Sequence, residues 1–404
     1  MASRWYATKI YIQDPLYSLL PELKVPNSKI YLDHNATSPL LPEVKNEMSE
    51  VAQQVFANPS SPHWAGRNAR ALLEESRESL ANSLGAKSQE ILFTSGGTES
   101  NNTVLRQLLF ISGKQHLITT GIEHPSVLET CKILAGQPSI NFTELVVDSF
   151  GKIEPENLLK VLRPETSLIS VMTANNETGN LQPIKELSKI AQEKKIPFHT
   201  DLVQAFGKIQ LDLSLSGVNY ASATAHKLGG PCGIGLLYVK QGSFFQSLIS
   251  GGKQERLRRA GTENVILAVG FAKAVEWHLA NQSSLRDRFK KFRGQILKEI
   301  KKIKGIFLNT DLGNSMPHTL NFGCKNVSAE SILISLDLDG IAVSTGSACS
   351  SGAMEASPVL LSMGLSRAEA KSSLRVSWGW STTESDINYF CRRLTFHIQR
   401  LQRK

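Results

Sequence analysis

Short runs of hydrophobic residues alternate with amphipathic stretches from about residue 90 to residue 240. The runs are bounded by glycine and polar residues, as buried β-strands usually are, and the stretches between them have the period of amphipathic helices. This alternation predicts an α/β fold, with a mostly parallel seven-stranded sheet and helices on both of its faces. Ligands bind such sheets beyond the carboxyl ends of the strands. The expected strands are Ile91–Ser95, Leu117–Thr120, Leu145–Val147, Leu168–Thr173, Phe198–Asp201, Ala221–Thr224 and Ile234–Val239.

The pattern changes after about residue 281, where long helical segments and few strands predict a smaller α+β lobe. One of its helices is expected to start at the capping box Ser366–Glu369, and a strand is expected at Leu374–Ser377. We therefore expect three parts. Residues 1–43 are an N-terminal arm that joins the small lobe, residues 44–280 are the large domain, and residues 281–404 are the small C-terminal domain.

The chain is basic, with a net charge of +9 and an isoelectric point near 9.2. A nucleic-acid surface would explain this balance, but the basic residues follow the faces of expected helices. From Asp287 to Ile303, hydrophobic residues recur at helical spacing and lysines occupy the opposite side. Arg392, Arg393 and Arg400 lie likewise outside the hydrophobic stripe of a final helix. We interpret the charge as that of solvated helices and expect no direct nucleic-acid binding.

The apolar and cysteine positions disfavour membrane, secreted and zinc-binding proteins. No apolar run approaches the roughly 18 residues of a membrane span, and the first 30 residues lack the short apolar core of a secretory signal. We therefore expect a cytoplasmic protein with no membrane partner. The cysteines are odd in number and scattered, so neither a disulfide framework nor a zinc site is indicated. They are Cys131, Cys232, Cys324, Cys349 and Cys391.

Polar residues follow several of the expected strands. Gly97 and Thr98 lie in a glycine turn that opens a helix, where backbone N–H groups favour a phosphate. A plain turn with Thr98 as the helix N-cap is the alternative. His124 and Asn176 each follow an expected strand, and Asp201 is the last residue of one. Taken singly, these residues are as well explained by structural roles, because a strand-end acid, for example, often caps a helix.

Lys227 ends the segment Ser222–Lys227 and precedes Gly229 and Gly230. A strand that delivers a lysine into a glycine-rich turn is unusual as structure, because lysine is rarely buried without a partner. Such a lysine can form a Schiff base with an aldehyde cofactor, whereas a surface lysine in a loop is the plain alternative.

Together, these strand-end residues supply what pyridoxal phosphate (PLP) requires. The cofactor needs a lysine, an anion site for its phosphate, a group that stacks on the ring and a carboxylate at the pyridine nitrogen. A carboxylate about 3 Å from that nitrogen gains roughly 5 kcal/mol before desolvation at an effective dielectric near 20, which is enough to keep the nitrogen protonated. We therefore expect PLP as the cofactor.

Short motifs follow one another over most of the chain: Tyr31–Thr37, Asn58–Ser61, Phe93–Asn102, Glu123–His124, Asn175–Glu177, Asp201 with Gln204, His226–Lys227, Arg259–Asn264 and Ser347–Cys349. In this order they resemble the motifs of fold-type I PLP-dependent transferases of the class V aminotransferase group. More narrowly, they resemble those of cysteine desulfurases of the nitrogenase-associated and iron–sulfur cluster assembly type. So many motifs in a fixed order make the resemblance specific.

The resemblance implies a role for each of these residues. Lys227 would hold PLP and move the α-proton of the substrate, and His124 would stack on the ring and take part in proton transfer. Asp201 would pair with the pyridine nitrogen, while the oxygen-bearing side of the ring would be contacted by Gln204 and Asn176. The phosphate would be held by Gly97, Thr98, Thr224, His226 and, from the other subunit of a homodimer with a shared active site, Thr262. The carboxylate of the substrate L-cysteine would be bound by Arg375, Asn35 and Asn176.

Cys349 lies in a run of small residues from Ser344 to Ala353. Such a run has little to pack, so we expect an exposed thiol on a mobile loop rather than a buried structural cysteine. The resemblance implies that its thiolate attacks the sulfur of L-cysteine, which leaves alanine and a persulfide on Cys349. No resident metal is expected, and a transient iron–sulfur contact at Cys349 stays open.

The resemblance leaves the reaction partners open. A selenocysteine lyase, another class V PLP enzyme and a sulfur-transfer scaffold without catalysis are the alternatives to a cysteine desulfurase. The sulfur acceptor is expected to be a protein of iron–sulfur cluster assembly or of a tRNA or cofactor thiolation relay. The chain departs from its relatives at Cys232, where they usually carry lysine, and at Leu257, where they usually carry glycine.

Overall fold

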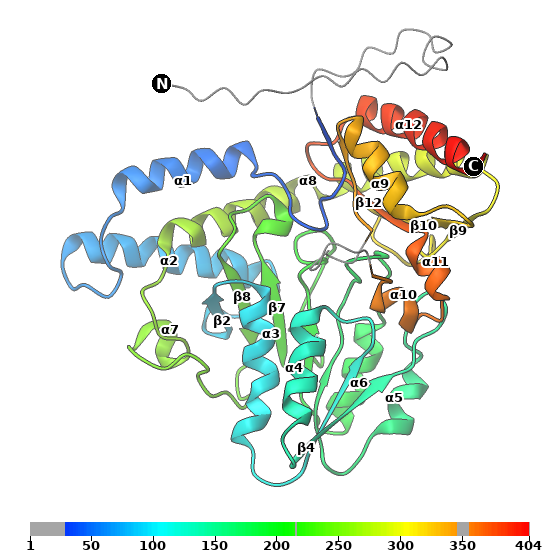
Figure 1. The fold of residues 1–404 in the computed structure, drawn as a ribbon. Helices are drawn as coiled ribbons and strands as arrows, with labels where there is room; N and C mark the ends of the chain where they lie inside the picture. Colours follow the sequence, from blue (N-terminus) through cyan, green and yellow to red (C-terminus); the bar gives the residue numbers. More distant parts are fainter. Residues whose placement is uncertain (1–28, 215, 346–354, 404) are drawn as a thin grey trace.

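The computed structural model describes residues 29–214, 216–345 and 355–403. A seven-stranded sheet forms the centre of its larger part, in the order β2-β8-β7-β6-β5-β3-β4 (Figure 1). All neighbouring strands are parallel except β8, which runs antiparallel to β2 and β7. The prediction of a mostly parallel seven-stranded sheet is confirmed. Its strands are β2 (Ile91–Thr94), β3 (Gln115–Thr120), β4 (Ile140–Leu145), β5 (Thr166–Ser170), β6 (Phe198–Asp201), β7 (Tyr220–Thr224) and β8 (Gly235–Val239).

Alternate residues of these strands pack into two hydrophobic cores, one on each face of the sheet. Leu117 and Leu168 pack with helices α3 and α4, whereas their chain neighbours Ile118 and Ile169 pack on the other face with α1, α2, α5, α6 and the start of α8. This period of two is expected of strands that are buried on both faces. The helices and 3₁₀ turns around the sheet are α1 (Pro42–Gln54), α2 (Trp64–Asn82), η2 (Ser88–Glu90), α3 (Gly97–Leu105), η3 (Arg106–Phe110), α4 (Pro125–Ala135), α5 (Pro155–Val161), α6 (Ile184–Glu193), η4 (His226–Leu228) and α7 (Gln254–Leu257).

A third core belongs to the smaller lobe. It lies between an antiparallel three-stranded sheet, in the order β12-β10-β9, and helices α9, α12 and the second half of α8. The capping box at Ser366 opens α11 as predicted, and the strand expected from Leu374 is β12. The elements of this lobe are β1 (Ile30–Tyr31), β9 (Ile306–Leu308), β10 (Thr319–Cys324), α9 (Ala329–Leu338), β11 (Ile341–Ala342), α10 (Pro358–Ser362), α11 (Arg367–Lys371), β12 (Ser373–Ser377) and α12 (Glu384–Gln402).

Helix α8 (Val265–Ile300) runs through both parts of the molecule. Its first third packs in the core beneath the large sheet, and its second half packs in the core of the smaller lobe. The expected boundary between residues 280 and 281 falls inside this helix. Strand β1 pairs in parallel with β11, so the chain enters the described structure on the smaller lobe. The division of the chain into an arm and two domains stays a prediction, and residues 1–28 of the arm lie outside the described residues.

Two expectations about single elements are wrong. The strand expected at Leu145–Val147 is β4, which ends at Leu145, and Val146 beyond it is 74% exposed. Because β4 is an edge strand whose outward residues are polar, it has no apolar run to mark it. Arg393 is not on the solvated side of α12 but buried, and its guanidinium donates to both carboxylate oxygens of Asp339 at 2.7 and 2.9 Å.

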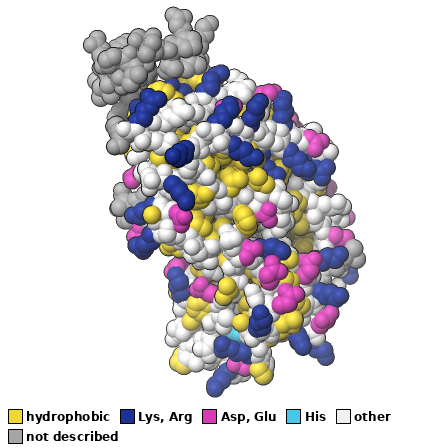
Figure 2. All heavy atoms as spheres, turned by 90° about the vertical axis from the view of Figure 1, so that its right-hand side faces the viewer, with side chains coloured by type: hydrophobic (Ala, Val, Ile, Leu, Met, Phe, Trp, Pro, Cys, Tyr) yellow, Lys and Arg dark blue, Asp and Glu magenta, His cyan; other side chains and the backbone are white. Residues whose placement is uncertain are grey.

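Basic side chains are conspicuous on one face of the molecule. Figure 2 shows Lys and Arg gathered in the upper part of that face, at the height of α9 and α12, with acidic side chains more frequent lower down. Lys298, Lys301, Arg392 and Arg400 are exposed, as the interpretation of solvated helices requires. None of the helices in the described part of the chain is both long and apolar enough to cross a membrane.

Candidate active site

A cavity of about 900 Å³, its open mouth included, lies at the carboxyl ends of the strands of the large sheet. Segments that follow β2, β3, β5, β6 and β7 form its walls, together with residues of the smaller lobe. All the predicted site residues lie on its lining except Thr262, which lies elsewhere, and Cys349, which lies outside the described residues. Those brought together are Asn35, Gly97, Thr98, His124, Asn176, Asp201, Gln204, Thr224, His226, Lys227 and Arg375.

Lys227 lies in the turn η4, directly after β7. Its Nζ donates hydrogen bonds to the backbone carbonyl oxygens of Asn35 and Ala36, at 2.7 and 2.5 Å. Burial, reinforced by the positive charge of Arg375, lowers the pKa of Lys227 to about 8, although nearby carboxylates act in the opposite direction. A substantial part of the amine is therefore neutral near pH 8 and available as a nucleophile.

A chain of hydrogen bonds joins Asp201 to His124 along one wall of the cavity. The Asp201 carboxylate accepts from the backbone N–H of Val203 and from Asn101 Nδ2, both at 2.8 Å. Asn101 Nδ2 also donates to Ser126 Oγ at 2.9 Å, and Ser126 Oγ lies 2.8 Å from His124 Nδ1. The carboxylate expected to face the pyridine nitrogen is thus held in place by α3 and by the backbone after β6, and Ser126 of α4 contacts it through Asn101.

Asn101 and Ser126 are residues that the sequence does not single out. A polar residue inside a helix looks like any other solvated position, yet Asn101 and Ser126 are both buried. Their spacing from predicted site residues is the sequence feature that could have indicated them. Asn101 lies three residues after Thr98, on the same side of α3, and Ser126 lies two residues after His124.

His124 is the N-cap of α4, and its Nδ1 accepts a hydrogen bond from the backbone N–H of Ser126 at 3.1 Å. In the neutral ring this places the proton on Nε2. Burial lowers the pKa of His124, against the attraction of Asp201 and in the same direction as the charge of Lys227. The neutral imidazole therefore predominates at pH 7.

Three side-chain amide oxygens on the cavity lining are buried and have no hydrogen-bond partner among the described residues: Asn35 Oδ1, Asn176 Oδ1 and Gln204 Oε1. The amide nitrogens of Asn35 and Gln204 are engaged, since Asn35 Nδ2 donates to Asn176 O and Gln204 Nε2 donates to Asn35 O, both at 3.0 Å. A buried carbonyl without a donor costs about 1–3 kcal/mol. A polar ring and an amino acid bound in the cavity would satisfy these oxygens, so the residues present fit PLP and its substrate.

The helix N-terminus expected to bind phosphate is that of α3, which begins at Gly97. Its N-cap is Gly96, so the alternative in which Thr98 caps the helix is wrong, and Thr98 lies in the first turn instead. The first N–H groups of a helix lack intrahelical partners and carry partial positive charge, which favours an anion. A side chain at Gly97 would approach Val203 Cγ2 to 2.8 Å, so only glycine fits there without displacement.

Thr224 and His226 flank the same end of the cavity. Thr224 Oγ1 donates to the carbonyl oxygen of Ile234 at 3.0 Å, and His226 Nδ1 lies 3.2 Å from Thr37 Oγ1. Burial and two neighbouring lysines lower the pKa of His226 to about 4. A phosphate at this end would therefore meet neutral hydrogen-bonding groups rather than a charged imidazole.

Arg375 of β12 reaches the cavity from the smaller lobe. It is 4% exposed, its Nη2 is paired with Asp33 Oδ1 at 2.7 Å, and its Nη1 donates to Asn176 O at 3.1 Å. These contacts hold the guanidinium in one orientation, which suits the bidentate binding of a carboxylate. Asp33 lies within the Tyr31–Thr37 motif but carries no predicted role.

Glu123, next to His124, is a second residue without a predicted role. Its Oε1 accepts hydrogen bonds from Thr120 Oγ1 at 2.9 Å and from the backbone N–H of Met172 at 2.8 Å. Burial raises the pKa of Glu123 to about 8 against the effect of these hydrogen bonds. Its carboxyl group is therefore mostly protonated at pH 7 and adds no negative charge to the cavity wall.

The segment before Thr262 has an unusual backbone. Glu255, Arg256 and Leu257 of α7 follow one another at φ angles of 46°, 58° and 67°. For residues other than glycine, this left-handed conformation costs roughly 1–2 kcal/mol each. Thr262 follows on an exposed loop that leads into α8. Strong contacts elsewhere must therefore hold the segment in place.

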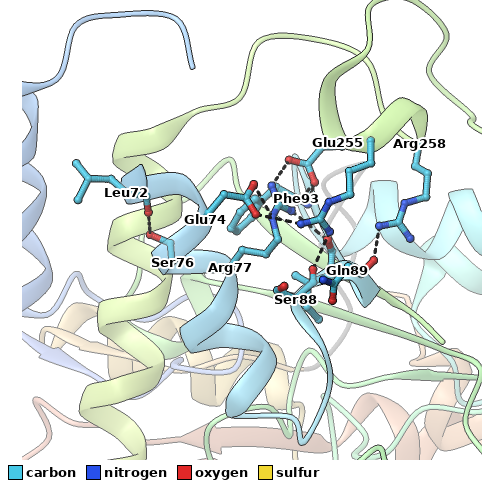
Figure 3. Close-up of polar contacts among 11 residues, drawn as sticks. Leu72, Glu74, Ser76, Arg77, Ser88, Gln89, Phe93, Glu255 and Arg258 are labelled. Atoms are coloured by element: carbon cyan, nitrogen blue, oxygen red, sulfur yellow. Dashed lines mark hydrogen bonds and ion pairs between the residues drawn. The ribbon is translucent and has the colours of Figure 1, made fainter. Parts of the chain in front are cut away.

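A buried ion pair anchors this segment to the sheet (Figure 3). The two carboxylate oxygens of Glu255 accept from the guanidinium of Arg77 at 2.6 and 2.8 Å, and one of them also accepts from the backbone N–H of Phe93 at 3.0 Å. Arg77 Nη1 donates in addition to the carbonyl oxygen of Ile91 at 3.0 Å. The pair thus fixes the start of the Thr262 loop against strand β2.

Metal and disulfide chemistry find no support in the described part of the chain. No group of three or more His, Cys, Asp or Glu side chains is placed there to hold a metal ion. The four cysteines within it are free, and three are buried while Cys232 is exposed. Burial raises the pKa of both Cys131 and Cys391 to about 12, so these thiols are poor nucleophiles.

Comparison with known proteins agrees with this geometry. The family model described as aminotransferase class-V matches residues 30–390. A cysteine desulfurase IscS of Dictyoglomus turgidum is 44% identical over 377 residues, which is 93% of this chain and 95% of the relative. A solved structure of a NifS-like protein is similar with a TM-score of 0.86 and 35% identity, covering 92% of this chain and 99% of that chain. A structure of SspA in complex with cysteine has a TM-score of 0.76 and 34% identity, covering 87% of this chain and 98% of that chain. The chain therefore belongs to the class V aminotransferase family and, within it, to the cysteine desulfurases.

Proposed function

We propose that the residues gathered in the large cavity carry out the removal of sulfur from L-cysteine, giving L-alanine and a persulfide on Cys349. As a cysteine desulfurase of the class V aminotransferase family, the chain is a PLP-dependent enzyme. The observation that carries the proposal is the convergence of Lys227, Asp201 and Arg375 on one cavity. Together they offer a nucleophilic amine, a fixed carboxylate and a fixed guanidinium.

Residues from both ends of the cavity would hold PLP. Lys227 would make the covalent link through Nζ, Asp201 would pair with the pyridine nitrogen, and the N–H groups at the start of α3 would bind the phosphate, together with Thr98, Thr224 and His226. His124 would lie against the ring, with Asn176 and Gln204 near its oxygen. When bound, PLP supplies an electron-withdrawing ring that stabilises negative charge on the α-carbon of the substrate.

The substrate carboxylate would bind at Arg375. Its guanidinium is already oriented by Asp33 and by the carbonyl oxygen of Asn176, so little conformational freedom is lost on binding. Asn35 is predicted to help bind this carboxylate, but its Nδ2 already donates to Asn176 O and to Thr319 Oγ1. Its Oδ1, which has no partner among the described residues, would instead accept from the amino group of the substrate. This arrangement would place the α-carbon on the Lys227 side of the cavity.

Proton transfer would fall to two groups with lowered pKa values. Lys227 Nζ would take the α-proton, since burial makes its amine partly neutral near pH 8. His124 would carry a proton on Nε2 in its neutral form and would exchange it with the substrate. Because Glu123 is mostly protonated, its carboxyl group does not compete for these protons at pH 7.

The sulfur step would belong to Cys349. Its thiolate attacks the sulfur of the bound cysteine, an S–S bond forms as the Cβ–S bond breaks, and the electron pair of the broken bond stays with Cβ. Cβ then takes a proton and becomes the methyl group of alanine. The sulfur is oxidised and the carbon is reduced, so the step needs no outside oxidant. Without this cysteine, the same cavity would support other PLP reactions.

The proposal extends to partners. We infer a homodimer in which Thr262 of one chain reaches the phosphate site of the other, because Thr262 is exposed and does not line the cavity of its own chain. The persulfide would pass to a protein acceptor, and the name IscS of the relatives supports an iron–sulfur assembly protein over a thiolation relay. The free cysteines support a reducing, cytoplasmic compartment.

A cysteine substitution tests the proposed chemistry. Cys349→Ser should bind PLP with unchanged absorption but release no alanine from L-cysteine and form no persulfide, as measured by amino-acid analysis and by mass spectrometry of the intact chain. Cys232→Ser, the matched control at the exposed cysteine of the described residues, should keep wild-type turnover. Release of sulfur by Cys349→Ser at the wild-type rate would contradict the proposal.

A further inference from the structure

A second cavity lies next to the proposed active site. It is narrow: its interior leaves about 30 Å³ for the centres of water-sized molecules, within about 490 Å³ of space between atoms that includes its open mouth. Among the described residues, Lys227 is the one that the linings of the two cavities share. Its walls come from the segment after β6, from α8, and from the chain on either side of the β10–β12 pair. Nothing in the proposed reaction uses this cavity.

The lining of the second cavity carries positive and imidazole groups without any carboxylate. None of the described residues that form it is Asp or Glu. In a folded protein, a group of basic side chains around a cavity is normally balanced by acids or by a bound anion. The basic and imidazole residues of the lining are His34, Lys208, Lys227, His278, Arg286 and His318.

Lys208 is the least compensated of these groups. Its Nζ lies 3.3 Å from His318 Nε2, and an imidazole nitrogen accepts only one of the three hydrogens of an ammonium group. Burial and the charge of Lys227 lower the pKa of Lys208 to about 7. A negatively charged group in the cavity would restore the charged form of Lys208 and pair with it.

Two further donors on the lining lack acceptors. Trp378 is fully buried, and its Nε1 has no hydrogen-bond partner within the described ranges. Gln282 Nε2 is buried and equally without a partner there. Both nitrogens can only donate. The missing partner of Trp378, Gln282 and Lys208 is in each case an acceptor, which is what an anion provides.

Most of the remaining lining is apolar. Leu285, Phe289 and Trp380 contribute hydrocarbon and aromatic surface beside the donors. We propose that the second cavity binds a small organic carboxylate with a short apolar body. A zwitterion of the same size should bind poorly, because its ammonium would face Lys208 and Arg286 with no carboxylate on the lining to accept from it. The cavity therefore discriminates against free amino acids, including the substrate and product of the neighbouring site.

The proposal implies that affinity depends on the protonation of Lys208. Burial lowers the pKa of the surrounding imidazoles far enough that they are neutral above about pH 5, so they contribute no charge that changes near neutral pH. Above pH 7, carboxylate affinity should fall by up to about tenfold per pH unit as Lys208 loses its proton. Lys227, the other lysine of the lining, would not titrate as a free amine in the PLP-loaded protein, because it would hold the cofactor. The titratable and charged groups that face Lys208 are His34, His226, Lys227, His278, Arg286 and His318.

Calorimetric titration of the PLP-loaded protein tests the proposal, which does not depend on the proposed reaction. The probes are propionate, the neutral propionamide, the zwitterion glycine betaine, which cannot react with PLP, and inorganic phosphate. Propionate should bind at pH 6.5 and at least about tenfold more weakly at pH 8.5. Propionamide and betaine should show no binding in the same range. Phosphate that binds more tightly than propionate would overturn the assignment of an organic ligand.

Variants separate the two cavities. Lys208→Met should weaken propionate binding by about tenfold or more, and Gln282→Glu should do the same by placing a carboxylate on the lining. Lys189→Met, at an exposed lysine of α6, is the matched control and should change nothing. Arg375→Met should leave propionate affinity within about twofold. Propionate binding that is lost in Arg375→Met and kept in Lys208→Met would overturn the proposal, because it would belong to the active site.

Discussion

At the scale of single residues, the ionisable groups in and around the active-site cavity differ in protonation because their surroundings differ. Burial keeps Glu123 mostly protonated and His124 neutral at pH 7, while the Lys227 amine is brought into the range where both of its forms are populated. Asp201, by contrast, is surrounded by donors from Val203 and Asn101. Asp201, which lines the cavity, is thus held by donors, whereas Glu123, which is not part of the lining, is mostly protonated.

Asn101 should matter for activity although it makes no predicted contact with substrate. Asn101→Ala removes the donor to Asp201 Oδ2 and the link to Ser126, so the carboxylate loses its fixed position. We expect alanine release from L-cysteine to fall by roughly tenfold to a hundredfold, since a hydrogen bond to a charged group is worth about 1.5–3 kcal/mol. Steady-state kinetics and PLP content measure the effect. Asn102→Ala, its neighbour on α3, is the control, and an equal loss in both would point to a general weakening of α3.

Glu123 should make stability depend on pH. Its pKa is raised to about 8 from an ordinary value of 4.5, so the folded chain binds more protons than the unfolded chain between these values. The stabilisation is present below pH 4.5 and is lost as the pH rises through 8. Glu123→Gln should remove this loss of stability at high pH. At pH 8, the free energy of unfolding of the variant should be higher than that of the wild type by at least about 1 kcal/mol.

Urea unfolding of the two proteins at pH 5, 6.5 and 8 checks this expectation. The exposed Glu129→Gln serves as the control and should keep the wild-type dependence. Parallel curves for Glu123→Gln and the wild type across the three pH values would show that the Glu123 carboxyl is ionised in the folded state.

At the scale of elements, α7 shows how a packed pair imposes an unfavourable backbone. Its left-handed residues are held because Glu255 is tied to Arg77 and to strand β2 (Figure 3). Removing either member would leave a buried charge unpaired, which typically costs 3–5 kcal/mol. The loop that carries Thr262 thus has a rigid start, which suits a residue proposed to reach into another chain.

A substitution at Leu257 tests the strain of this left-handed backbone directly. It lies at a φ of 67° and is 67% exposed, so its side chain gains little from packing within the chain. Leu257→Gly should raise the free energy of unfolding by about 0.5–1 kcal/mol, because glycine adopts this conformation without steric cost. Thermal unfolding measures the gain. Leu257→Ala keeps the unfavourable conformation and should not be stabilised; a gain in both variants would instead mean that the exposed side chain itself is destabilising.

At the scale of the whole molecule, the site draws on distant parts of one chain and, as proposed, on a second chain. Asn35, Asp201 and Arg375 come from the N-terminal segment, the large sheet and the smaller lobe. The cavity therefore exists only when both lobes are folded and in contact. Thr262 would add the requirement of a partner.

Mixed dimers test that requirement. Lys227→Ala and Thr262→Ala should each be impaired alone. After mixing and subunit exchange, half of the dimers are hybrids in which one of the two sites has both intact residues. About a quarter of the wild-type activity per site should then return if each site uses residues of both chains. No recovery after mixing, with exchange verified by mass spectrometry, would show that Thr262 acts within its own chain.

The sequence predicted the parts of the site that follow from strand ends and from ordered motifs. Nine of the eleven predicted residues on the cavity lining come together because the carboxyl ends of parallel strands meet at one edge of a sheet. The other two, Asn35 and Arg375, were found from the ordered motifs and the resemblance, since they come from other parts of the chain. The sequence did not predict roles for three residues near the site, Asn101, Ser126 and Glu123. Their roles depend on three-dimensional contacts that no local sequence pattern indicates. Arg393 was placed on a solvated helix side for the same reason, since its partner Asp339 lies 54 positions earlier.

Helix α8 has a consequence for how the molecule unfolds. It is 36 residues long, which corresponds to about 54 Å, and its two halves belong to two separate hydrophobic cores. Unfolding only one half of such a helix is unfavourable, because the other half then loses the backbone hydrogen bonds that cross the boundary. The two lobes should therefore lose their structure in a single cooperative transition, and a probe placed in either lobe should report the same midpoint.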